Sequence, residues 1–384
     1  MGGHAAGEVA AQLTVENVIQ NVKRQRPLFE RARRQDVDPA TLAATLREAV
    51  QDACAEVYRV ASNREGYAGM GCTLTMLVLA GHRAVMGHVG DTRLYLIRDG
   101  NIEQLSTDHT LAAELVRIGY LAPEDAKDHR GAHTLTRAVG TQPSVDVETL
   151  VFDVRAGDVF LLCSDGLSGY LNSPGELLPL MRDDFEAIPD DLVAFARRAG
   201  GEDNISAVAV RVDAEPKEAA ALAELGADAK AKLDALSASF LFEHLTLAQA
   251  LRLMHVCDVR PYETGDEIAR EGDPGGTFYL VLEGRITVIR DGTARGELSD
   301  GDTAGETMLL DARPCRASLR ATTPTRVLAI EGTRFHRFLR HRPWLGLTLL
   351  ERLGRRAADS LDRANMALAA MNPEDTASPP GDLF

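Results

Sequence analysis

Three carboxylates stand where acids could act together, each beside turn residues just beyond a strand-like run. They are Asp91 in GHVGDTRLYL, Asp165 in LLCSDGL and Asp203 in GGEDNIS. Each acid taken alone is also explained as a turn former, since Asp-Gly and Asp-Asn are common turn pairs. Carried by strands to one rim of a sheet, the set would form the oxygen-rich shell that Mg²⁺ or Mn²⁺ prefers. A paired-metal site of this kind supplies a hydroxide nucleophile and clamps a phosphoryl group for displacement.

A second stretch, AGETMLLDARPCRAS, combines residues that could hold a different anion. Gly305 permits close backbone approach, and the residues after it predict a short helix start whose amides can face an anion. Arg316 can fork onto phosphate oxygens, and Glu306 could accept hydrogen bonds from sugar hydroxyls. The alternative is a surface turn with an exposed ion pair.

The elements that must position these residues change character along the chain. Strand-like runs alternate with turn signals from about residue 73 to 212, at TLTMLVLA, LYLIRDG, DVFLLCSDG and ISAVAVRV, and helical spacing interrupts them at TLAAELVRIG and DLVAFARRAG. An Ala, Glu, Lys and Leu-rich segment then predicts a helical connector. After it come a helix at LTLAQALRLMHV, short strands punctuated by glycine, and a helical pattern from about residue 344 to 371.

Bulk properties restrict the partners and the compartment. A chain of 384 residues predicts two domains, and 45% apolar residues support packed cores. The formal charge of −15 argues against binding to nucleic acid or an anionic membrane. The 5 cysteines are scattered without a C-x-x-C pair, as for thiols in a reducing cytosol, and no apolar run is long enough to span a membrane. We therefore expect a cytoplasmic protein.

The order of motifs in the first half resembles that of the bacterial metal-dependent, type 2C (PPM) serine/threonine protein phosphatases. The motifs are MGGHAAGEVA, MGCTLT, GHVGDTRLYL, LSTDHT, LTRAVG, LLCSDGL and GGEDNIS. The resemblance implies an α+β fold in which two packed β-sheets are flanked by helices (αββα), with a binuclear Mn²⁺ or Mg²⁺ centre at one end. It implies that Asp165 and Asp203 are metal ligands and that Asp108 binds an additional metal. It assigns Asp91 and Arg93 to structural support, and residues 120–133 to a variable flap that influences substrate choice.

The opening MGGH raises a separate expectation. In the family the first motif reads Asp-Gly-Met-Gly-Gly-His, and its Asp bridges both metals, whereas this chain begins at the Met. We expect the first strands to be missing and the metal centre to be incomplete, because two close cations need a carboxylate between them. Two explanations are open: Met1 is an internal codon taken for the start, or the protein is a pseudophosphatase that lost these strands. We favour the first, since deleting strands exposes apolar partners and unpaired edges.

The second half resembles a cyclic nucleotide-binding domain from about residue 240 to 371, with an entry helix, an eight-stranded β-roll, a phosphate-binding cassette and a closing helix. The resemblance implies that Glu306 binds the ribose hydroxyl, that Gly305 and Ala317 offer backbone amides, and that Arg316 neutralises the cyclic phosphate. Ala317 stands where threonine accompanies cyclic GMP, so we expect cyclic AMP.

These observations predict four segments: a phosphatase domain (residues 1–213), a helical linker (214–239), a cyclic nucleotide-binding domain (240–371) and a disordered tail (372–384). We expect a phosphatase acting on phosphoserine or phosphothreonine in proteins and regulated by the nucleotide. The alternative is a catalytically inactive scaffold that senses the nucleotide. Regulation of a phosphatase by the nucleotide requires two states of the catalytic half, and the affinity for the nucleotide must differ between these two states.

Overall fold

The computed structural model describes residues 5–34, 37–181, 184–213, 219–309, 313–340 and 342–371. The chain divides into two compact units. The first comprises Met1–Ala231 together with Thr246–His255, and the second comprises Lys232–Leu245 and Val256–Phe384. None of the described helices is both long and apolar enough to cross a lipid bilayer.

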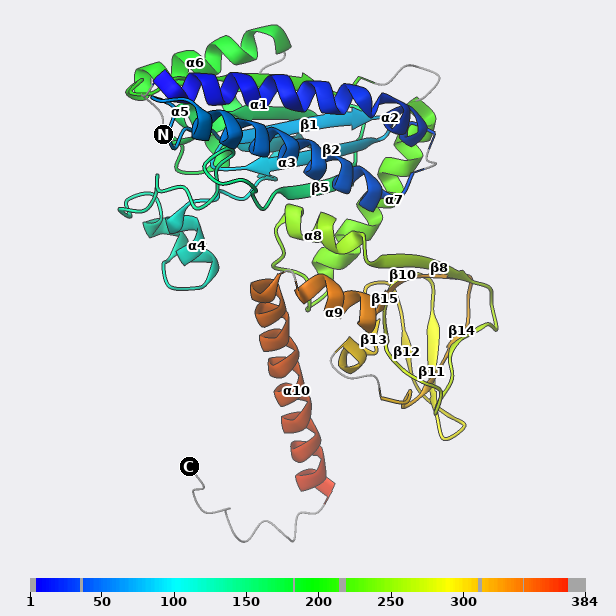
Figure 1. Ribbon diagram of the computed structural model, residues 1–384. Helices are drawn as coiled ribbons and strands as arrows, with labels where there is room; N and C mark the ends of the chain where they lie inside the picture. Colours follow the sequence, from blue (N-terminus) through cyan, green and yellow to red (C-terminus); the bar gives the residue numbers. More distant parts are fainter. Residues whose placement is uncertain are drawn as a thin grey trace, which may run out of the picture. The chain divides into compact units, whose positions relative to one another are not determined.

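Two antiparallel sheets form the centre of the first unit (Figure 1). One sheet has the strand order β1-β2-β5 and the other β4-β3-β6-β7. The strands are β1 (Leu74–Ala80), β2 (Arg83–Val89), β3 (Arg93–Arg98), β4 (Asn101–Gln104), β5 (Glu148–Asp153), β6 (Val159–Cys163) and β7 (Ala207–Arg211). The two sheets meet where Phe152 of β5 lies 5.9 Å from Phe160 of β6, measured between ring centroids.

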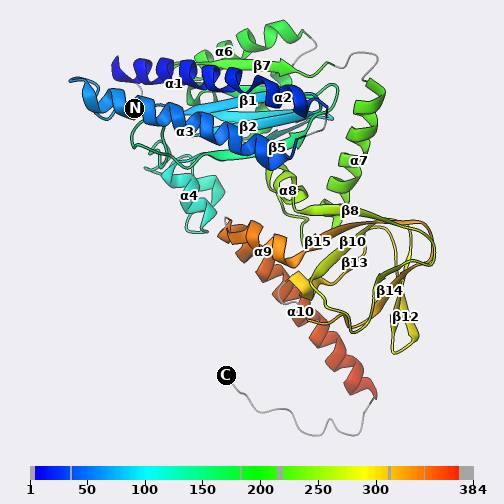
Figure 2. The same ribbon diagram turned by 45° about the vertical axis from the view of Figure 1, so that its right-hand side comes forward.

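Helices cover the outer faces of both sheets, so the layer order is α, β, β, α. The helices of this unit are α1 (Ala5–Arg24), α2 (Arg26–Ala32), α3 (Pro39–Asn63), α4 (Leu111–Arg117), α5 (Asp165–Ser168), α6 (Ile188–Ala199) and α8 (Leu247–Met254). Short 3₁₀ turns lie at Pro123–Asp125, Pro174–Leu180 and Phe185–Ala187. Figures 1 and 2 show α1 beside α3 on the β1-β2-β5 sheet, whereas α6 packs against β7.

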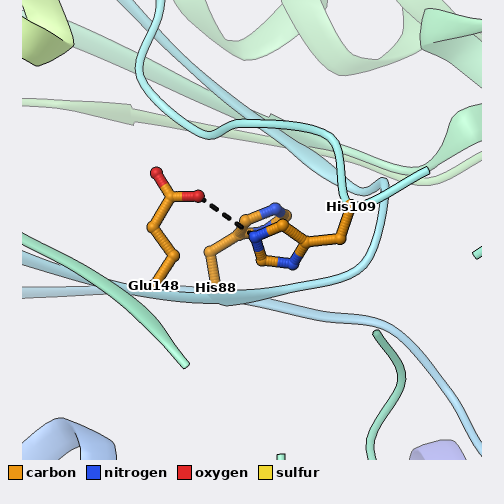
Figure 3. Close-up of side chains that lie close together, drawn as sticks. All are labelled: His88, His109 and Glu148. Atoms are coloured by element: carbon orange, nitrogen blue, oxygen red, sulfur yellow. Dashed lines mark hydrogen bonds and ion pairs between the residues drawn. The ribbon is translucent and has the colours of Figure 1, made fainter. Parts of the chain in front are cut away.

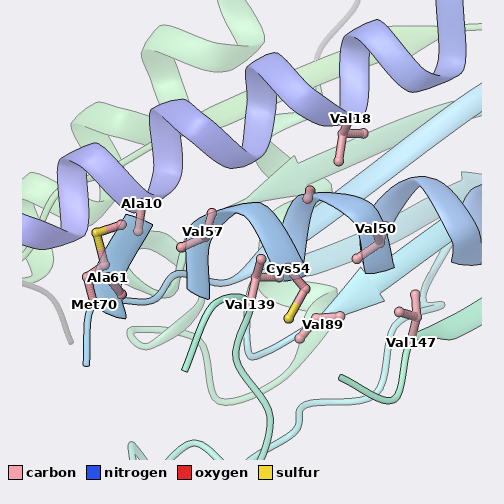
Figure 4. Packing of buried hydrophobic residues seen from close by; sticks show 11 residues of the cluster. Ala10, Val18, Val50, Cys54, Val57, Ala61, Met70, Val89, Val139 and Val147 are labelled. Carbon is pink, nitrogen blue, oxygen red and sulfur yellow. The ribbon is translucent and has the colours of Figure 1, made fainter. Parts of the chain in front are cut away.

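The sequence of α3 explains its place in this arrangement. Asp38 caps the helix by accepting a hydrogen bond from the amide of Ala40, and Pro39 occupies the first turn. Buried residues then recur every three or four positions and face the sheet. Figure 4 shows part of this core, in which Val50, Cys54 and Val57 of α3 pack with residues of α1, β2 and the loops below. Burying each such aliphatic side chain stabilises the fold by roughly 1.5–3 kcal/mol.

The helix α7 (Ala219–Ala238) contains the boundary between the units, since the division falls after Ala231. The second unit has two four-stranded antiparallel sheets, with the orders β13-β10-β15-β8 and β12-β11-β14-β9. Its strands are β8 (Cys257–Tyr262), β9 (Glu267–Ala269), β10 (Thr277–Glu283), β11 (Ile286–Arg290), β12 (Thr293–Leu298), β13 (Thr303–Ala304), β14 (Ser318–Ala321) and β15 (Thr325–Glu331). A 3₁₀ turn lies at Glu306–Leu309, and α9 (Gly332–Arg340) and α10 (Pro343–Met371) follow the last strand.

The interior of this roll is apolar and contains residues of both sheets. Val281 and Val327 come from one sheet, and Ile286 and Leu319 from the other. At one turn Gly284 has φ +106, and a Cβ there would lie 2.6 Å from the carbonyl oxygen of Pro324. Only glycine fits this turn without displacing the backbone.

The α+β architecture predicted from the sequence is confirmed in both units. The helices predicted near residues 111, 191, 246 and 344 are present as α4, α6, α8 and α10. Met1–His4, which contain the opening motif, lie outside the described residues, and so does the tail predicted from residue 372.

Candidate functional site

Two of the predicted acids come together at one end of neighbouring strands. Strands β6 and β7 run antiparallel, and their register ends at the pair Cys163 and Ala207. Asp165 follows the end of β6, as predicted. Contrary to the sequence pattern, Asp203 does not follow a strand but lies after helix α6 and precedes the start of β7. Both acids therefore lie at the same rim of the sheet, as the sequence pattern required for a shared cation site.

The Ser164 hydroxyl and the backbone at Gly166 hold the two acidic loops against each other. Ser164 donates from Oγ to the carbonyl of Asn204 at 3.1 Å, and its Oγ accepts the amide of Ser206 at 3.0 Å. Gly166 packs so closely that a Cβ there would lie 2.3 Å from the Asn204 carbonyl oxygen. The spacing between the Asp165 and Asp203 loops is thus fixed by the Ser164 hydroxyl and by main-chain atoms.

Asp91, which the sequence assigns to support, lies in the electrostatic field of the other acids. It follows Gly90 in the turn between β2 and β3 and is half-buried. Burial, together with the negative charges of Asp165 and Asp108, raises the pKa of Asp91 to about 6. Within the described ranges Asp91 forms no ion pair. A carboxylate held among like charges is suited to binding a cation.

Asp108, by contrast, already has a strong partner. Arg93 at the start of β3 donates to both of its carboxylate oxygens, with a shortest distance of 2.6 Å, and Gln104 donates to Oδ1 at 3.0 Å. Burial opposes the charge of Arg93, but the neighbouring Asp108 outweighs it and raises the pKa of the guanidinium. Asp108 therefore lies near the acidic rim with its oxygens committed to Arg93, whereas Asp91 has no such cationic partner among the described side chains.

Beside these acids lies a buried group that the sequence did not single out, formed by His88, His109 and Glu148 (Figure 3). The two imidazole rings lie 4.7 Å apart between centroids. His109 Nδ1 accepts the amide of Gly90 at 3.1 Å, so its proton is on Nε2, which lies 3.2 Å from Glu148 Oε2. His109 immediately follows Asp108 in LSTDHT, and this adjacency is the signal that could have drawn attention to it.

This group has the composition of a metal site, but its nitrogens are already used. His88 donates from Nε2 to the carbonyl of Thr107 at 3.0 Å, and its Nδ1 lies 2.8 Å from Thr75 Oγ1. Burial lowers the pKa of His88 to about 4, so the ring is neutral at physiological pH. With both nitrogens of each ring engaged, the cluster acts as a hydrogen-bonded network rather than a preformed metal centre.

The segment predicted as a variable flap lies between α4 and the strand-like contact of Leu135 with Thr110. Tyr120 is 84% exposed at its start. Lys127 donates to Asn172 Oδ1 at 3.1 Å, which ties the segment to the loop that follows α5. His133, near the end of the segment, is exposed. Its charge lowers the pKa of Asp91, although burial and the charges of Asp165 and Asp108 raise it by more. The flap therefore borders the acidic rim.

In the second unit, the segment that leaves β13 carries Gly305 and Glu306. Gly305 has φ +80, and a Cβ there would lie 2.5 Å from the carbonyl oxygen of Thr277. Glu306 accepts a hydrogen bond from Thr303 Oγ1 at 2.7 Å. The backbone at Gly305 thus leaves no room for a side chain, and Glu306 is held by its own loop.

The same segment enters the other sheet of the roll at β14, directly after Arg316 and Ala317. Arg316 is exposed, and among the described residues it forms no ion pair. The flanking Cys315 is fixed by backbone hydrogen bonds of 2.9 Å with Gly272 and Asp273. Arg316 therefore projects from an anchored backbone, and none of the described acidic side chains pairs with its guanidinium. Residues 310–312, in the middle of the segment, lie outside the described residues.

Known family models match both halves of the chain. Residues 1–207 match the model of the protein phosphatase 2C family, and residues 259–342 match the cyclic nucleotide-binding domain. The phosphatase match covers more than half of the chain. The chain therefore belongs to the protein phosphatase 2C family and carries a cyclic nucleotide-binding domain after it.

Similar individual proteins are serine/threonine phosphatases of bacteria. The serine/threonine phosphatase stp of Listeria monocytogenes is 33% identical over 219 residues, which cover 56% of this chain and 83% of the relative. The serine/threonine protein phosphatase PstP of Mycobacterium tuberculosis is 35% identical over 213 residues, which cover 55% of this chain and 39% of that protein. A crystal structure of the same phosphatase aligns at 33% identity with a TM-score of 0.48, covering 56% of this chain and 86% of that one.

Proposed function

We propose that the protein is a metal-dependent serine/threonine phosphatase that hydrolyses phosphomonoesters on phosphoproteins. The observation that supports this most strongly is the meeting of the Asp165 and Asp203 loops at one rim of the sheet, with Asp91 beside them. Oxygen ligands from three loops suit Mn²⁺ or Mg²⁺. The membership of the protein phosphatase 2C family and the stp and PstP relatives give independent support.

The residues of this rim fit such cations. The carboxylates of Asp165 and Asp203 would hold them. Asp91, which the resemblance assigns to structural support, would add a third carboxylate, because positive charge would relieve the repulsion that, after burial, raises its pKa. A divalent cation bound there would polarise the phosphoryl oxygens and would make water a stronger nucleophile. Arg93 holds Asp108, the additional ligand that the sequence predicts, in one orientation at the border of the rim. The flap from residue 120 to 133 would contact the phosphoprotein beside the reacting phosphate.

We also propose that a cyclic nucleotide regulates this activity through the second unit. Arg316 would pair with the cyclic phosphate, and Glu306 would accept a hydrogen bond from the ribose hydroxyl. The backbone amides of Gly305 and Ala317 would approach the phosphate. The exposed Arg316 and the glycine-only backbone at Gly305 support this assignment. With Ala317 at its position, cyclic AMP is the nucleotide we propose.

The hydrolytic function is tested with the full chain, Mn²⁺ and a phosphothreonine peptide. Asp165→Asn should lower kcat/KM by at least the roughly ten- to hundredfold that loss of a residue supporting a metal site costs. The matched control is Asp213→Asn, because Asp213 is exposed at the other end of β7, where it pairs with Arg211. Hydrolysis that is equal in the two variants would contradict the proposal. A chain that binds the phosphopeptide without cleaving it would instead favour the inactive scaffold.

Regulation is tested by calorimetric titration with cyclic AMP and by phosphatase assays with and without it. Arg316→Ala should weaken binding at least about tenfold, since a charge-assisted pair is worth about 1.5–3 kcal/mol. Arg320→Ala is the control, because Arg320 lies on the adjoining strand β14 at 4.0 Å from Glu267. An unchanged nucleotide response in Arg316→Ala would refute the gating model.

A further inference from the structure

The helix α8 lies outside both segments that match known families, between residues 207 and 259. Its start is well defined, since Thr246 and Gln249 form a reciprocal capping box. By its contacts it belongs to the first unit, where it packs against β5. A segment that neither family model covers thus contributes part of the phosphatase unit.

The only charged side chain of α8 is Arg252, and it points at a buried acid. Arg252 pairs with Glu148 at the start of β5, and the two side chains are 11% and 13% exposed. Burial would raise the pKa of Glu148, but the hydrogen bond with His109 and the charge of Arg252 lower it to about 2. Glu148 is therefore ionised, and α8 supplies the cation that compensates it.

From Glu148 the hydrogen bonds lead toward the acidic rim. Glu148 Oε2 accepts a hydrogen bond from His109 Nε2. The other side of His109 is bonded twice to Gly90, since its Nδ1 accepts the Gly90 amide at 3.1 Å and its own amide donates to the Gly90 carbonyl at 2.8 Å. Gly90 and His109 directly adjoin Asp91 and Asp108 in the chain. The orientation of His109 consequently sets the spacing between the two loops that carry these acids.

Other groups face the same carboxylate and imidazole but do not replace Arg252. Thr107 Oγ1 donates to Glu148 Oε1 at 3.3 Å, and His88 stacks against His109 as a neutral ring. Arg137 approaches His109 Nε2 at 3.3 Å, yet it forms its own ion pair with Asp146 at 2.9 Å. Arg252 is thus the buried guanidinium that, together with the hydrogen bond from His109, compensates the charge of Glu148.

We propose that Arg252 is a positioning residue of the phosphatase site: through Glu148 and His109 it fixes the turn of Gly90 and Asp91 against the loop of Asp108. This inference rests on the proposed phosphatase function. Removal of Arg252 leaves a buried carboxylate without its cation, so that Glu148 must move toward water, and this movement breaks its hydrogen bond with His109 Nε2. The turn that carries Asp91 then loses its anchor although no acid of the rim has been altered.

The test compares four forms of the full chain by amide hydrogen exchange without metal: wild type, Arg252→Met, the double variant Arg252→Met/Glu148→Gln, and the control Arg47→Met. In the double variant the introduced glutamine keeps an oxygen for His109 while the uncompensated charge is removed. Arg47 is exposed on α3 and donates to Thr149, the residue after Glu148, at 3.0 Å. The amide of Leu161, fully buried in the central strand β6, reports on unfolding of the whole unit.

We expect Arg252→Met to speed exchange at the Gly90 amide by at least about tenfold relative to Leu161, and the double variant to restore it. With Mn²⁺ and p-nitrophenyl phosphate, kcat/KM should fall roughly ten- to hundredfold in Arg252→Met and recover in the double variant. If Arg252→Met does not fold, Arg252→Lys replaces it, because lysine keeps the charge but lacks the planar guanidinium. Exchange at the Gly90 amide should then be faster than in the wild type, but by less than the roughly tenfold expected for Arg252→Met.

Several outcomes would overturn the proposal. Unchanged exchange at Gly90 would show that the turn does not depend on Arg252, and equal acceleration at Gly90 and Leu161 would show a purely structural role. Failure of the double variant to recover would exclude the charge on Glu148 as the cause. If none of the four forms hydrolyses p-nitrophenyl phosphate, the proposed function fails, but hydrogen exchange at the Gly90 amide still decides the role of Arg252.

Discussion

A single methyl group at Gly166 should separate the two acidic loops. In Gly166→Ala the new Cβ would lie 2.3 Å from the Asn204 carbonyl oxygen and 2.9 Å from its carbon. Ordinary contacts begin at 3.4 Å, so the loops of Asp165 and Asp203 must move apart by about 1 Å. Both atoms belong to the backbone, which a rotamer change cannot clear. A displacement of about 1 Å at a reacting centre can reduce the rate about a hundredfold.

The assay is Mn²⁺-dependent hydrolysis of p-nitrophenyl phosphate, measured over a series of Mn²⁺ concentrations. Gly166→Ala should need more Mn²⁺ for half-maximal activity and should reach a lower kcat, whereas urea unfolding should show that the unit remains folded. Gly175→Ala is the matched control, because a Cβ there meets only Ser173 Oγ at 3.7 Å. If Gly166→Ala retained the Mn²⁺ dependence and rate of the control, the acidic loops would not form the metal site.

Three further changes test other parts of the structure. Asp158→Ala leaves Arg98, 11% exposed, without the partner that it contacts at 2.7 Å, and urea unfolding should show a loss of about 3–5 kcal/mol. In Gly305→Ala the backbone has φ +80 and the new Cβ would lie 2.5 Å from a backbone carbonyl oxygen. Titration with cyclic AMP should show at least about tenfold weaker binding than in the control Gly296→Ala, where the new Cβ meets open space. The pKa of Glu148 falls from 4.5 to about 2 on folding. Glu148 therefore contributes fully to the free energy of unfolding above pH 4.5, and this contribution is lost as the pH falls toward about 2. Urea unfolding over this pH range should show a shallower decline of stability in Glu148→Gln than in the wild type.

Much of the strand pattern could be predicted because apolar runs end in turn residues. The runs at residues 73–80 and 158–166 correspond to β1 and β6, and the run at 205–212 corresponds to β7. The sequence indicates a strand-like run before Asp91 but does not predict the extent of β2, where Gly87 and His88 interrupt the apolar series, although the strand is almost fully buried between two neighbours. Burial by neighbouring strands is a tertiary effect that a local pattern does not contain.

The acidic site was predictable in part for the same reason. Asp165 and Asp203 follow and precede recognisable strands, so their meeting at one rim depends only on the pairing of β6 with β7. Which of the remaining acids is available could not be inferred from the sequence. Arg93 and Asp108 are separated in the sequence, and only the pairing of β3 with its neighbours shows that their side chains meet. Among the described residues, Asp91 is left without such a cationic partner.

The contribution of α8 is the furthest from sequence reasoning, and it bears on the regulation by cyclic nucleotide that we propose. Arg252 meets Glu148 across 104 positions of the chain, and its helix has the ordinary apolar pattern of a packing element. The residues on both sides, Leu245 and Val256, belong to the second unit. A change in that unit on nucleotide binding would therefore act on α8 from both ends of the helix. Since Arg252 holds Glu148 and His109, such a change would reach the turn of Asp91 through one ion pair, without any need to alter the flap or the acids themselves.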